Sequence, residues 1–368
     1  MWYPSVKYLW TITILTIPGR EKYCKQLIES INETPLTFPV QIAVVYNRKT
    51  AEDIYSIEKQ IKSYSAVLPL SVYFNSHDTS IVGGRNFQLN VCKTPLICFI
   101  DDDVTLHGEI FPILETKLRN KAMGILGIRS YREDSDELFK PNANTPQVDY
   151  NGIRYAQVQG MLAAGYRNLF IDLGGFNPRR GYWGEWTELN LRMWRSGFPT
   201  GYCMDGGYLR HWHKAPESPT RNMEGREIHV LWGLLCTALE YDAVEINEAT
   251  ETFWQLVEQR YLAYSFGEQL SAKQLLKTTL ELMPRISSEW GQIIAFKMEV
   301  DQHPFKFKPF HRFTIEDVKA VGKYAQKHIK RYHNNYWRVV GEGTLFPRSN
   351  KLRKWIRRMK NYISNKLS

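Results

Sequence analysis

The sequence predicts an α/β protein in which helices cover a mostly parallel sheet, followed by an α-helical C-terminal extension. Short apolar runs alternate with amphipathic stretches from Leu9 to about Ile128, which is typical of such a sheet. After residues 216–219 the pattern is helical throughout. With 368 residues the chain is too long for one ordinary core, and its 43% hydrophobic content is typical of globular proteins.

The apolar runs of the first part are each four to eight residues long and predict strands. They cover residues 11–16, 40–46, 70–74 and 96–100. Helices are expected between them over residues 23–31 and 51–63. Residues 134–149 are polar and contain two prolines, which predicts an irregular loop, and residues 157–203 form a second compact block.

The remaining helices are expected after a boundary at the proline pair Pro216 and Pro219. They cover residues 223–241, 249–266, 272–283, 289–300 and 315–337. We therefore expect a catalytic domain over residues 1–215, a helical extension over 216–346 and a basic amphipathic tail over 347–368.

Cysteine usage and hydropathy indicate a reducing compartment. The five cysteines show no paired spacing, which argues against a disulfide framework, and the absence of Cys-x-x-Cys argues against a structural zinc site. No run of about 18 apolar residues predicts a spanning helix, and the N-terminus lacks the pattern of a secretion signal. We expect a cytoplasmic protein.

The net charge of +10 is concentrated at the C-terminus. Residues 348–368 contain eight Lys or Arg and no Asp or Glu, which leaves 40 basic and 38 acidic side chains elsewhere. A nearly neutral body argues against a nucleic-acid partner. As a helix, the tail would gather its apolar side chains within an arc of about 140° opposite the basic ones. This pattern is typical of a helix lying on an anionic membrane surface; the alternative is that the apolar stripe packs on the helical extension.

An acidic triplet, Asp101-Asp102-Asp103, directly follows the apolar run that ends at Ile100. Open α/β sheets bind ligands at this edge, and clustered carboxylates there suit a hard cation such as Mn²⁺ or Mg²⁺ that bridges to substrate phosphates. In an extended chain Asp101 and Asp103 would point to the same side, as a metal clamp requires. The alternative interpretation is a solvated acidic turn.

Upstream of this triplet lies the sequence Gly83-Gly84-Arg85-Asn86. The glycines would let the backbone approach a ligand, and Arg85 could pair with a phosphate. A purely structural turn is an equally good interpretation.

Glu185 and Glu188 open a predicted helix and share its first turn. Carboxylates are favoured there by the helix dipole, which is a sufficient structural reason for both. Arg192 provides a partner for Glu188, whereas Glu185 follows a glycine and lies between tryptophans. Burial in such a partly apolar cleft raises a carboxylate pKa toward that of a general base. Further along, His211 and His213 flank Trp212 and are candidate metal ligands.

Three features in this order resemble the family 2 glycosyltransferases of GT-A fold, over about residues 9–215. They are Thr16-Ile17-Pro18-Gly19-Arg20, Gly84-Arg85-Asn86 followed by the acidic triplet, and Leu173-Gly174-Gly175-Phe176 leading to Gly184-Glu185. Residues 159–213 also resemble the C-terminal block of β-1,4-galactosyltransferases. The resemblance implies a Rossmann-like, nucleotide-diphospho-sugar transferase fold.

The resemblance also implies roles for individual residues. Asp101 and Asp103 match the Asp-x-Asp motif that holds metal and donor, and His211 matches the metal-ligating histidine, with His213 as the other candidate. Donor binding would involve Thr16, Arg20, Asn47, Arg85, Asp101 and Asp102. Glu185 matches the first residue of a Glu-Asp pair whose second residue is usually the base.

Two departures from the family pattern stand out. Trp186 occupies the position of the usual base, so that Glu185 or Glu188 must serve. Asn47 stands where the family usually carries an aspartate for the nucleobase.

The implied reaction is the transfer of a sugar from a nucleoside diphosphate sugar, with a UDP-sugar as the expected donor, to a hydroxyl of a glycan or lipid-linked acceptor, with inversion. The expected setting is the cytosolic face of a membrane. A catalytically inactive sugar- or nucleotide-binding homologue and a nucleotidyltransferase remain alternatives.

Overall fold

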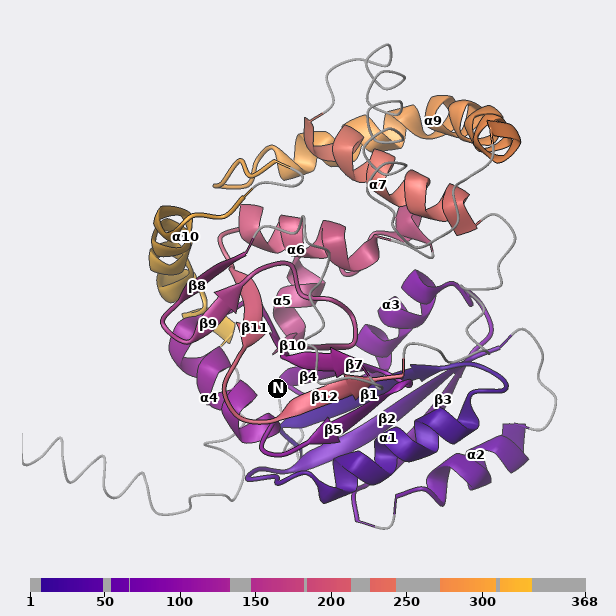
Figure 1. Cartoon of the computed structure of the whole chain (residues 1–368), viewed down its shortest axis with the longest axis vertical. Helices are drawn as coiled ribbons and strands as arrows, with labels where there is room; N and C mark the ends of the chain where they lie inside the picture. The colour runs from indigo at the N-terminus through magenta and orange to yellow at the C-terminus, as the bar shows by residue number, and fades with distance from the viewer. Residues whose placement is uncertain are drawn as a thin grey trace, which may run out of the picture.

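The computed structural model supports the predicted α/β class and the helical character of the C-terminal part (Figure 1). The structure describes residues 8–48, 54–65, 67–132, 147–181, 184–212, 226–242, 272–308 and 312–332. His213 and the whole predicted tail, 347–368, lie outside these described residues.

Four parallel strands form one half of the central sheet, in the order β3-β2-β1-β4. They are β1 (Trp10–Thr16), β2 (Val40–Asn47), β3 (Leu70–Asn75) and β4 (Leu96–Asp101). Their sequences are buried apolar runs, as predicted. The strand order reverses between β1 and β4, and α/β proteins bind ligands outside the carboxyl ends of strands at such a switch point.

Beyond β4 the sheet continues as β10-β6-β11-β9-β8, and β10 is antiparallel to β4. These strands are β10 (Leu162–Tyr166), β6 (Ile125–Ile128), β11 (Thr200–Cys203), β9 (Ile153–Tyr155) and β8 (Val148–Tyr150). The predicted loop over 134–149 is wrong at its end, where Val148 begins β8; most of that segment lies outside the described residues.

A small second sheet has the order β5-β12-β7. Its strands are β5 (Val104–His107), β12 (Tyr208–His211) and β7 (Ser130–Arg132). Strand β5 begins directly after the acidic triplet, and its antiparallel pairing with β12 sets His211 opposite Val104. This pairing brings His211 to the triplet from a distant part of the chain.

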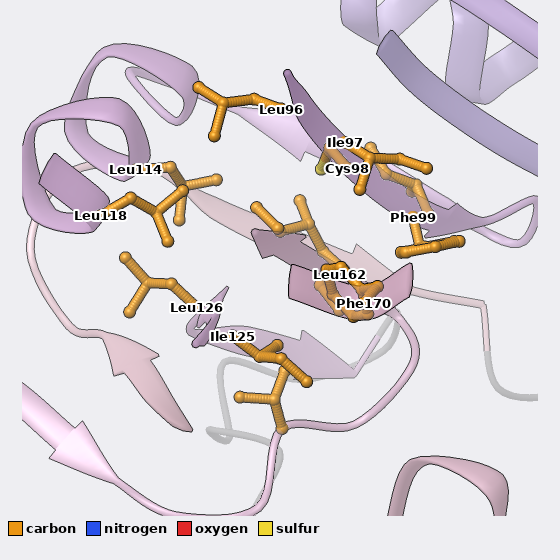
Figure 2. Packing of buried hydrophobic residues seen from close by; sticks show 14 of the residues in the cluster. Leu96, Ile97, Cys98, Phe99, Leu114, Leu118, Ile125, Leu126, Leu162 and Phe170 are labelled. Atoms are coloured by element: carbon orange, nitrogen blue, oxygen red, sulfur yellow. The ribbon is translucent and has the colours of Figure 1, made fainter. Parts of the chain in front are cut away.

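Helices cover the central sheet, with α3, α5 and α6 on the side that faces the C-terminal helices and α1 and α2 on the other (Figure 1). The helices are α1 (Glu21–Glu33), α2 (Ile54–Lys62), α3 (Ile81–Val91), α4 (Phe111–Lys121), α5 (Arg167–Asp172) and α6 (Glu185–Arg195), with a short 3-10 helix, η1 (Pro178–Arg180). Figure 2 shows part of the resulting core, where Phe99 and Leu96 of β4 lie near Leu162 of β10 and Leu114 of α4.

The described helices of the extension are α7 (Arg226–Asp242), α9 (Ala272–Val300) and α10 (Ile315–His328). Helices α7 and α9 lie beyond α6, on the side away from the sheet (Figure 1). The prediction of separate helices over 272–283 and 289–300 is wrong, because one helix continues through Pro284. Buried side chains occur on both sides of this proline, at Leu282, Ile286 and Ile293, so that packing offsets the lost backbone hydrogen bond.

Three predictions about the C-terminal part concern residues that the structure does not describe. The predicted helix over 249–266 and the end of the one over 315–337 lie outside the described residues, and so does the proposed domain boundary near 216.

All five cysteines are free and buried. None of the described helices combines the length and apolar character needed to cross a membrane.

Candidate active site

The acidic triplet forms the turn that joins β4 to β5. Asp101 is the last residue of β4, and residues 102 and 103 are in a turn. The extended conformation assumed for these residues is therefore wrong, because the chain must reverse to enter the second sheet. As a result the carboxylates diverge: Asp101 contacts α3, whereas Asp102 and Asp103 contact the segment after β1.

Thr16 and Arg20 hold the middle carboxylate of this turn. Thr16 Oγ1 donates to Asp102 Oδ2 at 2.6 Å, and the buried Arg20 donates through Nε to both carboxylate oxygens at 3.0 Å. Arg20 Nη2 also lies 2.9 Å from Asp103 Oδ2. Burial raises the pKa of Asp102 to about 6 against the opposing hydrogen bonds of Arg20 and Thr16. Asp102 therefore anchors the loop between β1 and α1 to the turn.

Asp103 and His211 form the second pair of the turn. His211 Nε2 lies 3.4 Å from Asp103 Oδ1, and the backbone N–H of Trp212 donates to the Asp103 carbonyl at 2.8 Å. Burial alone would raise the pKa of Asp103, but the hydrogen bonds and charges of His211 and Arg20 outweigh it and lower that pKa to about 2. Asp103 is thus an ionised carboxylate beside an imidazole.

Arg85 of α3 pairs with Asp101 in a buried, aromatic setting. Its guanidinium carbon lies 5.9 Å from the ring centre of Phe99 and 5.7 Å from that of Trp186, distances typical of cation–π contacts. Arg85 Nη1 also donates to Gln88 Oε1 at 3.2 Å. Burial raises the pKa of Asp101 and the charge of Asp103 adds to this, while Arg85 and His211 act in the opposite direction.

Three buried donors around Arg85 have no hydrogen-bond acceptor among the described residues. They are Arg85 Nε, Gln88 Nε2 and Trp186 Nε1. An unsatisfied buried donor typically costs about 1–3 kcal/mol of folding free energy. Other buried donors of this kind, such as Arg180 Nε and Arg192 Nε, lie in the supporting structure, so these three mark places where a bound acceptor could bond and do not by themselves identify a site.

Gly83 and Gly84 have a packing role in the structure. Both lie in the first turn of α3, and a Cβ at Gly84 would lie 2.6 Å from Leu15 and from Asn47 Nδ2. The glycine therefore lets α3 approach β1 and β2, which brings Arg85 over the end of β4. The packing therefore favours a structural role for Gly83 and Gly84 over an approach of their backbone to a ligand.

Asn47 lies at the end of β2, but its amide is already bonded within the protein. Asn75 Nδ2 donates to Asn47 Oδ1 at 2.8 Å, and Asn47 Nδ2 donates to the Ser80 carbonyl at 3.1 Å. These bonds tie the segment before α3 to the sheet. The structure does not bring Asn47 into contact with the acidic turn.

Glu185 is the first residue of α6 and is half-buried. Burial raises the pKa of its carboxyl and the negative charge of Asp101 adds to this, whereas its own backbone N–H and Arg85 oppose the rise. Glu185 therefore lies within electrostatic reach of both Arg85 and Asp101. A carboxylate with a raised pKa in this position is suited to accept a proton.

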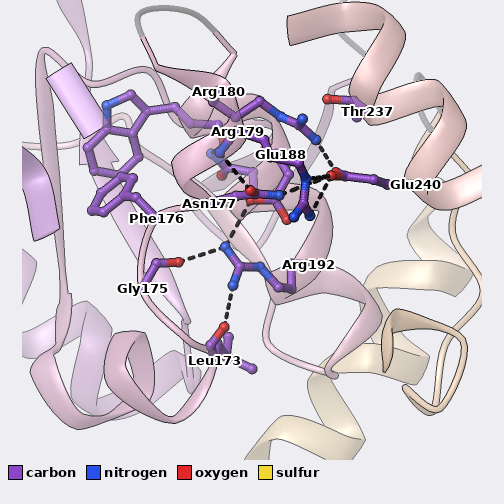
Figure 3. Close-up of polar contacts among 12 residues, drawn as sticks. Leu173, Gly175, Phe176, Asn177, Arg179, Arg180, Glu188, Arg192, Thr237 and Glu240 are labelled. Carbon is purple, nitrogen blue, oxygen red and sulfur yellow. Dashed lines mark hydrogen bonds and ion pairs between the residues drawn. The ribbon is translucent and has the colours of Figure 1, made fainter. Parts of the chain in front are cut away.

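Glu188, by contrast, is fully buried and both of its oxygens are bonded. Arg192 Nη2 lies 2.8 Å from Oε2, and the Tyr241 hydroxyl donates to Oε1 at 2.7 Å. Arg192 also donates to the carbonyls of Leu173 and Gly175, which belong to the glycine turn before α6 (Figure 3). Glu188 thus serves to hold this turn.

Trp186 lies in an aromatic cluster rather than in an open cleft. Its ring contacts Phe176 at 4.9 Å and Phe99 at 5.7 Å between centroids, and its side chain is buried. The residue in the position of the usual base therefore packs in the core and contacts Arg85.

Asp103 and His211 are the pair best suited to a divalent cation. Among the described residues, no three His, Cys, Asp or Glu side chains are gathered as metal ligands. Mg²⁺-type sites, however, commonly use one or two protein ligands, and substrate phosphates and water supply the others. The Asp103 carboxylate fits this chemistry and has the His211 nitrogen beside it; Asp103 also pairs with Arg20, as Asp101 does with Arg85.

Several residues of the site were not found from the sequence. Gln88 was missed because a glutamine inside a helix carries no motif, although it lies three residues after Arg85, on the same helix face. Tyr241 and Glu240 were missed because they come from α7, and only the tertiary fold brings them to α6 and η1.

The chain matches solved structures, whereas no family model and no curated protein sequence matches it. One match is the mannosyltransferase PcManGT from Pyrobaculum calidifontis in complex with GDP-Man and Mn²⁺, at 15% identity and a TM-score of 0.48, covering 81% of this chain and 87% of that one. Another is residues 1–349 of S. aureus TarS in complex with UDP, at 12% identity and a TM-score of 0.47, covering 92% of each chain.

A third match is GalNAc-T7 with UDP, GalNAc and Mn²⁺, at 12% identity and a TM-score of 0.46, covering 71% of this chain. The chain spans only 59% of the length of that protein. At these identities and TM-scores the matches carry no argument about activity, and we argue the function from the residues of the site.

Proposed function

We propose that this chain is a glycosyltransferase that moves a sugar from a nucleoside diphosphate sugar to a hydroxyl of a glycan or lipid-linked acceptor. The observation that carries this proposal is the array of charges at the carboxyl ends of β1 and β4. There, ionisable side chains from four separate segments meet at the switch point of the sheet, where α/β proteins bind ligands. Three carboxylates, two arginines and a histidine make up this array.

The donor diphosphate would bind beside Arg85 and the turn. Arginine recognises phosphate oxygens through parallel hydrogen bonds, and Arg85 Nε is one of the buried donors that have no acceptor within the described residues. Thr16, Arg20 and Asp102 would shape this edge by fixing the loop after β1. We assign no donor contact to Asn47, since its amide is bonded to Asn75 and Ser80.

Asp103 and His211 would hold a divalent cation, Mn²⁺ or Mg²⁺, with Asp101 nearby and His213 as a further candidate ligand. Such a cation supplies Lewis-acid charge neutralisation for the leaving diphosphate. Arg20 lies 2.9 Å from Asp103 Oδ2 and would hold this carboxylate in place.

Glu185 would act as the general base. Its carboxylate takes the proton of the acceptor hydroxyl while the acceptor oxygen bonds to the anomeric carbon and the bond from that carbon to the diphosphate oxygen breaks. A single displacement of this kind inverts the anomeric centre. The raised pKa of Glu185 supports this role because it brings the base closer to neutral pH.

The test is a transfer assay with UDP- and GDP-sugars, Mn²⁺ and simple glycoside acceptors, read out as nucleoside diphosphate released and product formed. The proposal expects turnover that excess chelator reduces and that Glu185→Gln lowers by about 10²- to 10⁴-fold. The position of Trp186 favours a second candidate, an inactive nucleotide-sugar-binding protein. Thermal stabilisation by a nucleotide sugar without any turnover would select that candidate, and neither stabilisation nor turnover would reject both.

A further inference from the structure

A buried charge cluster joins η1 to α7, on the far side of α6 from the sheet. We call it the junction cluster; it comprises Asn177, Arg179, Arg180 and Glu240 (Figure 3). Glu240 Oε1 accepts from Arg179 Nε at 2.7 Å and from Asn177 Nδ2 at 3.2 Å, and Oε2 accepts from Arg180 Nη2. One carboxylate of α7 therefore bonds two side chains of η1 and the side chain of its N-cap, Asn177.

The junction cluster is shielded from water. The side chains of Glu240 and Arg180 are both fully buried. Burial would lower the pKa of Arg180, but Glu240 and the other nearby acidic groups outweigh it, so that the guanidinium stays charged. Two arginines share this single carboxylate, so that its loss would leave buried charges uncompensated, which is strongly destabilising.

The cluster lies directly before the segment that leads to Glu185. Asn177 Oδ1 caps η1 by accepting from the backbone N–H of Arg179 at 3.1 Å, and the indole of Trp232 in α7 donates to the Arg179 carbonyl at 2.9 Å. The Gly181 carbonyl, one residue after η1, then accepts from the Val82 N–H of α3 at 3.1 Å. Helix α7 thus fixes the position of η1. Gly181, the residue after η1, is hydrogen-bonded to the first turn of α3, the helix that carries Arg85.

Helix α7 also contacts the other end of this segment. A Cβ at Gly184 would lie 3.5 Å from the Cα of Gly233 in α7, and Gly184 has a φ of +82°, which favours glycine. Gly184 is the residue before Glu185. The start of α6 therefore contacts α7, and the Glu240 carboxylate holds η1, which precedes α6 in the chain.

We propose that Glu240 is a positioning residue for Glu185: through Arg179 and Arg180 it fixes η1, which precedes Gly181 and the undescribed residues 182 and 183 that lead to Gly184 and Glu185. The helical extension is then part of the catalytic framework rather than an appendage. This inference rests on the proposed function for the identity of the base. The contacts of Glu240 with η1 and of α7 with Gly184, on which it is built, do not depend on that function.

The test compares Glu240→Gln, which removes the charge, with Glu240→Asp, which keeps it, and with Asp301→Asn. Asp301 pairs with Arg195 at 2.9 Å and so joins the C-terminal end of the same helix α6 to the extension. It is the control for the loss of an ion pair between α6 and the extension, at a carboxylate that is more exposed than that of Glu240. For each full-length variant kcat, the KM for the donor, the Tm and the hydrogen exchange of the peptide 184–190 are measured below the Tm.

We expect Glu240→Gln to lower kcat between about ten- and a hundredfold while the donor KM stays within about twofold, because the base is misplaced and the donor edge is intact. Exchange in peptide 184–190 should rise. Glu240→Asp should restore most of kcat, and Asp301→Asn should lower the Tm without changing kcat.

A Glu240→Gln protein with wild-type kcat and a lower Tm would overturn the inference, as would a rise in donor KM equal to the loss of kcat. If Glu240→Gln does not fold, Trp232→Phe, which removes the α7 hydrogen bond to the Arg179 carbonyl, is measured instead: a lower kcat at an unchanged donor KM supports the inference, and a wild-type kcat overturns it. If the wild-type protein shows no transfer, the proposed function fails instead, and hydrogen exchange alone then tests whether Glu240 fixes the start of α6.

Discussion

The acidic turn after β4 and the junction cluster both combine carboxylates with arginines, but they differ in burial and in origin. Asp101 has a third of its side chain exposed, whereas the side chain of Glu240 is fully buried. The three aspartates are adjacent in sequence, while Glu240 bonds arginines 60 and 61 residues away. The acidic turn can thus be predicted from local sequence because its aspartates are adjacent, whereas the junction cluster cannot because its partners are far apart in the chain.

This difference has an energetic counterpart. Asp101 and Asp103 lie partly exposed at the end of a strand and in a turn, whereas Asp102 is buried against Arg20 and Thr16. The charges of the junction cluster and of Glu188 are desolvated, and the loss of one partner leaves the other buried without compensation. Substitutions of Asp101 and Asp103 should therefore affect chemistry more than stability, whereas those of Glu188 should act mainly on stability and those of Glu240 on both.

The largest effect on turnover is expected for Glu185→Gln, because a general base contributes about 10²- to 10⁴-fold to the rate. Donor affinity, measured by calorimetry, should remain, since Arg85 and the acidic turn are unchanged. If Glu188→Gln is the variant that loses turnover and keeps donor affinity, the roles of the two glutamates are reversed.

The pH dependence of kcat in the wild-type enzyme tests whether Glu185 is the base. A base must be deprotonated, so kcat should fall as the pH drops through the pKa of Glu185. Because burial raises that pKa, the acid limb should lie above the value of about 4.3 for an ordinary glutamate. An acid limb at or below that value would argue against Glu185.

Asp103→Asn should reduce turnover at least about a hundredfold, the upper range for loss of a group that only supports a metal ligand. It should also abolish the Mn²⁺ dependence of donor binding while the Tm changes little. The matched comparison is Asp102→Asn, which removes the anchor of Arg20 and should lower the Tm more than Asp103→Asn does. Full activity of Asp103→Asn, or of the wild type in excess chelator, would contradict the metal assignment.

Glu188→Gln should act on stability rather than on chemistry. Breaking its buried pair with Arg192 should cost about 3–5 kcal/mol of unfolding free energy, measured by chemical denaturation. Below the Tm the remaining folded protein should keep the donor KM of the wild type. A stability equal to that of the wild type would show that Arg192 and Tyr241 do not depend on this carboxylate.

The sequence predicted the sheet, the acidic triplet and the assignment of Glu188 to Arg192, because each depends on local pattern or spacing. It did not predict the divergence of Asp101 from Asp103, since the turn after β4 is imposed by the pairing of β5 with β12. The bonds of Asn47 to Asn75 and Ser80 were equally hidden, because they depend on how β2 and β3 align. The continuation of α9 through Pro284 was missed because buried side chains outweigh a local helix breaker.

The smallest effect on turnover is expected for removal of the tail, residues 348–368, which lies outside the described residues and to which we assign no role in catalysis. As a helix, its apolar stripe and eight basic side chains would bind an anionic membrane, each basic side chain contributing about 1 kcal/mol near the surface. The full-length protein should sediment with anionic liposomes, and high salt should weaken this because exposed charges are screened.

A chain that ends at Pro347 should stay in the supernatant and still turn over a soluble acceptor at the full-length rate. The apolar stripe of the tail consists of Leu352, Trp355, Ile356, Met359, Tyr362, Ile363 and Leu367. Replacing Trp355 and Ile356 by serine in the full-length chain tests this stripe without changing the charge, and it should lower liposome binding at high salt more than at low salt. Equal binding by the full-length and shortened chains would show that the tail is not the anchor. A loss of turnover in the shortened chain would show that the stripe packs on the helical extension, and would make the tail a third part of the framework that supports Glu185.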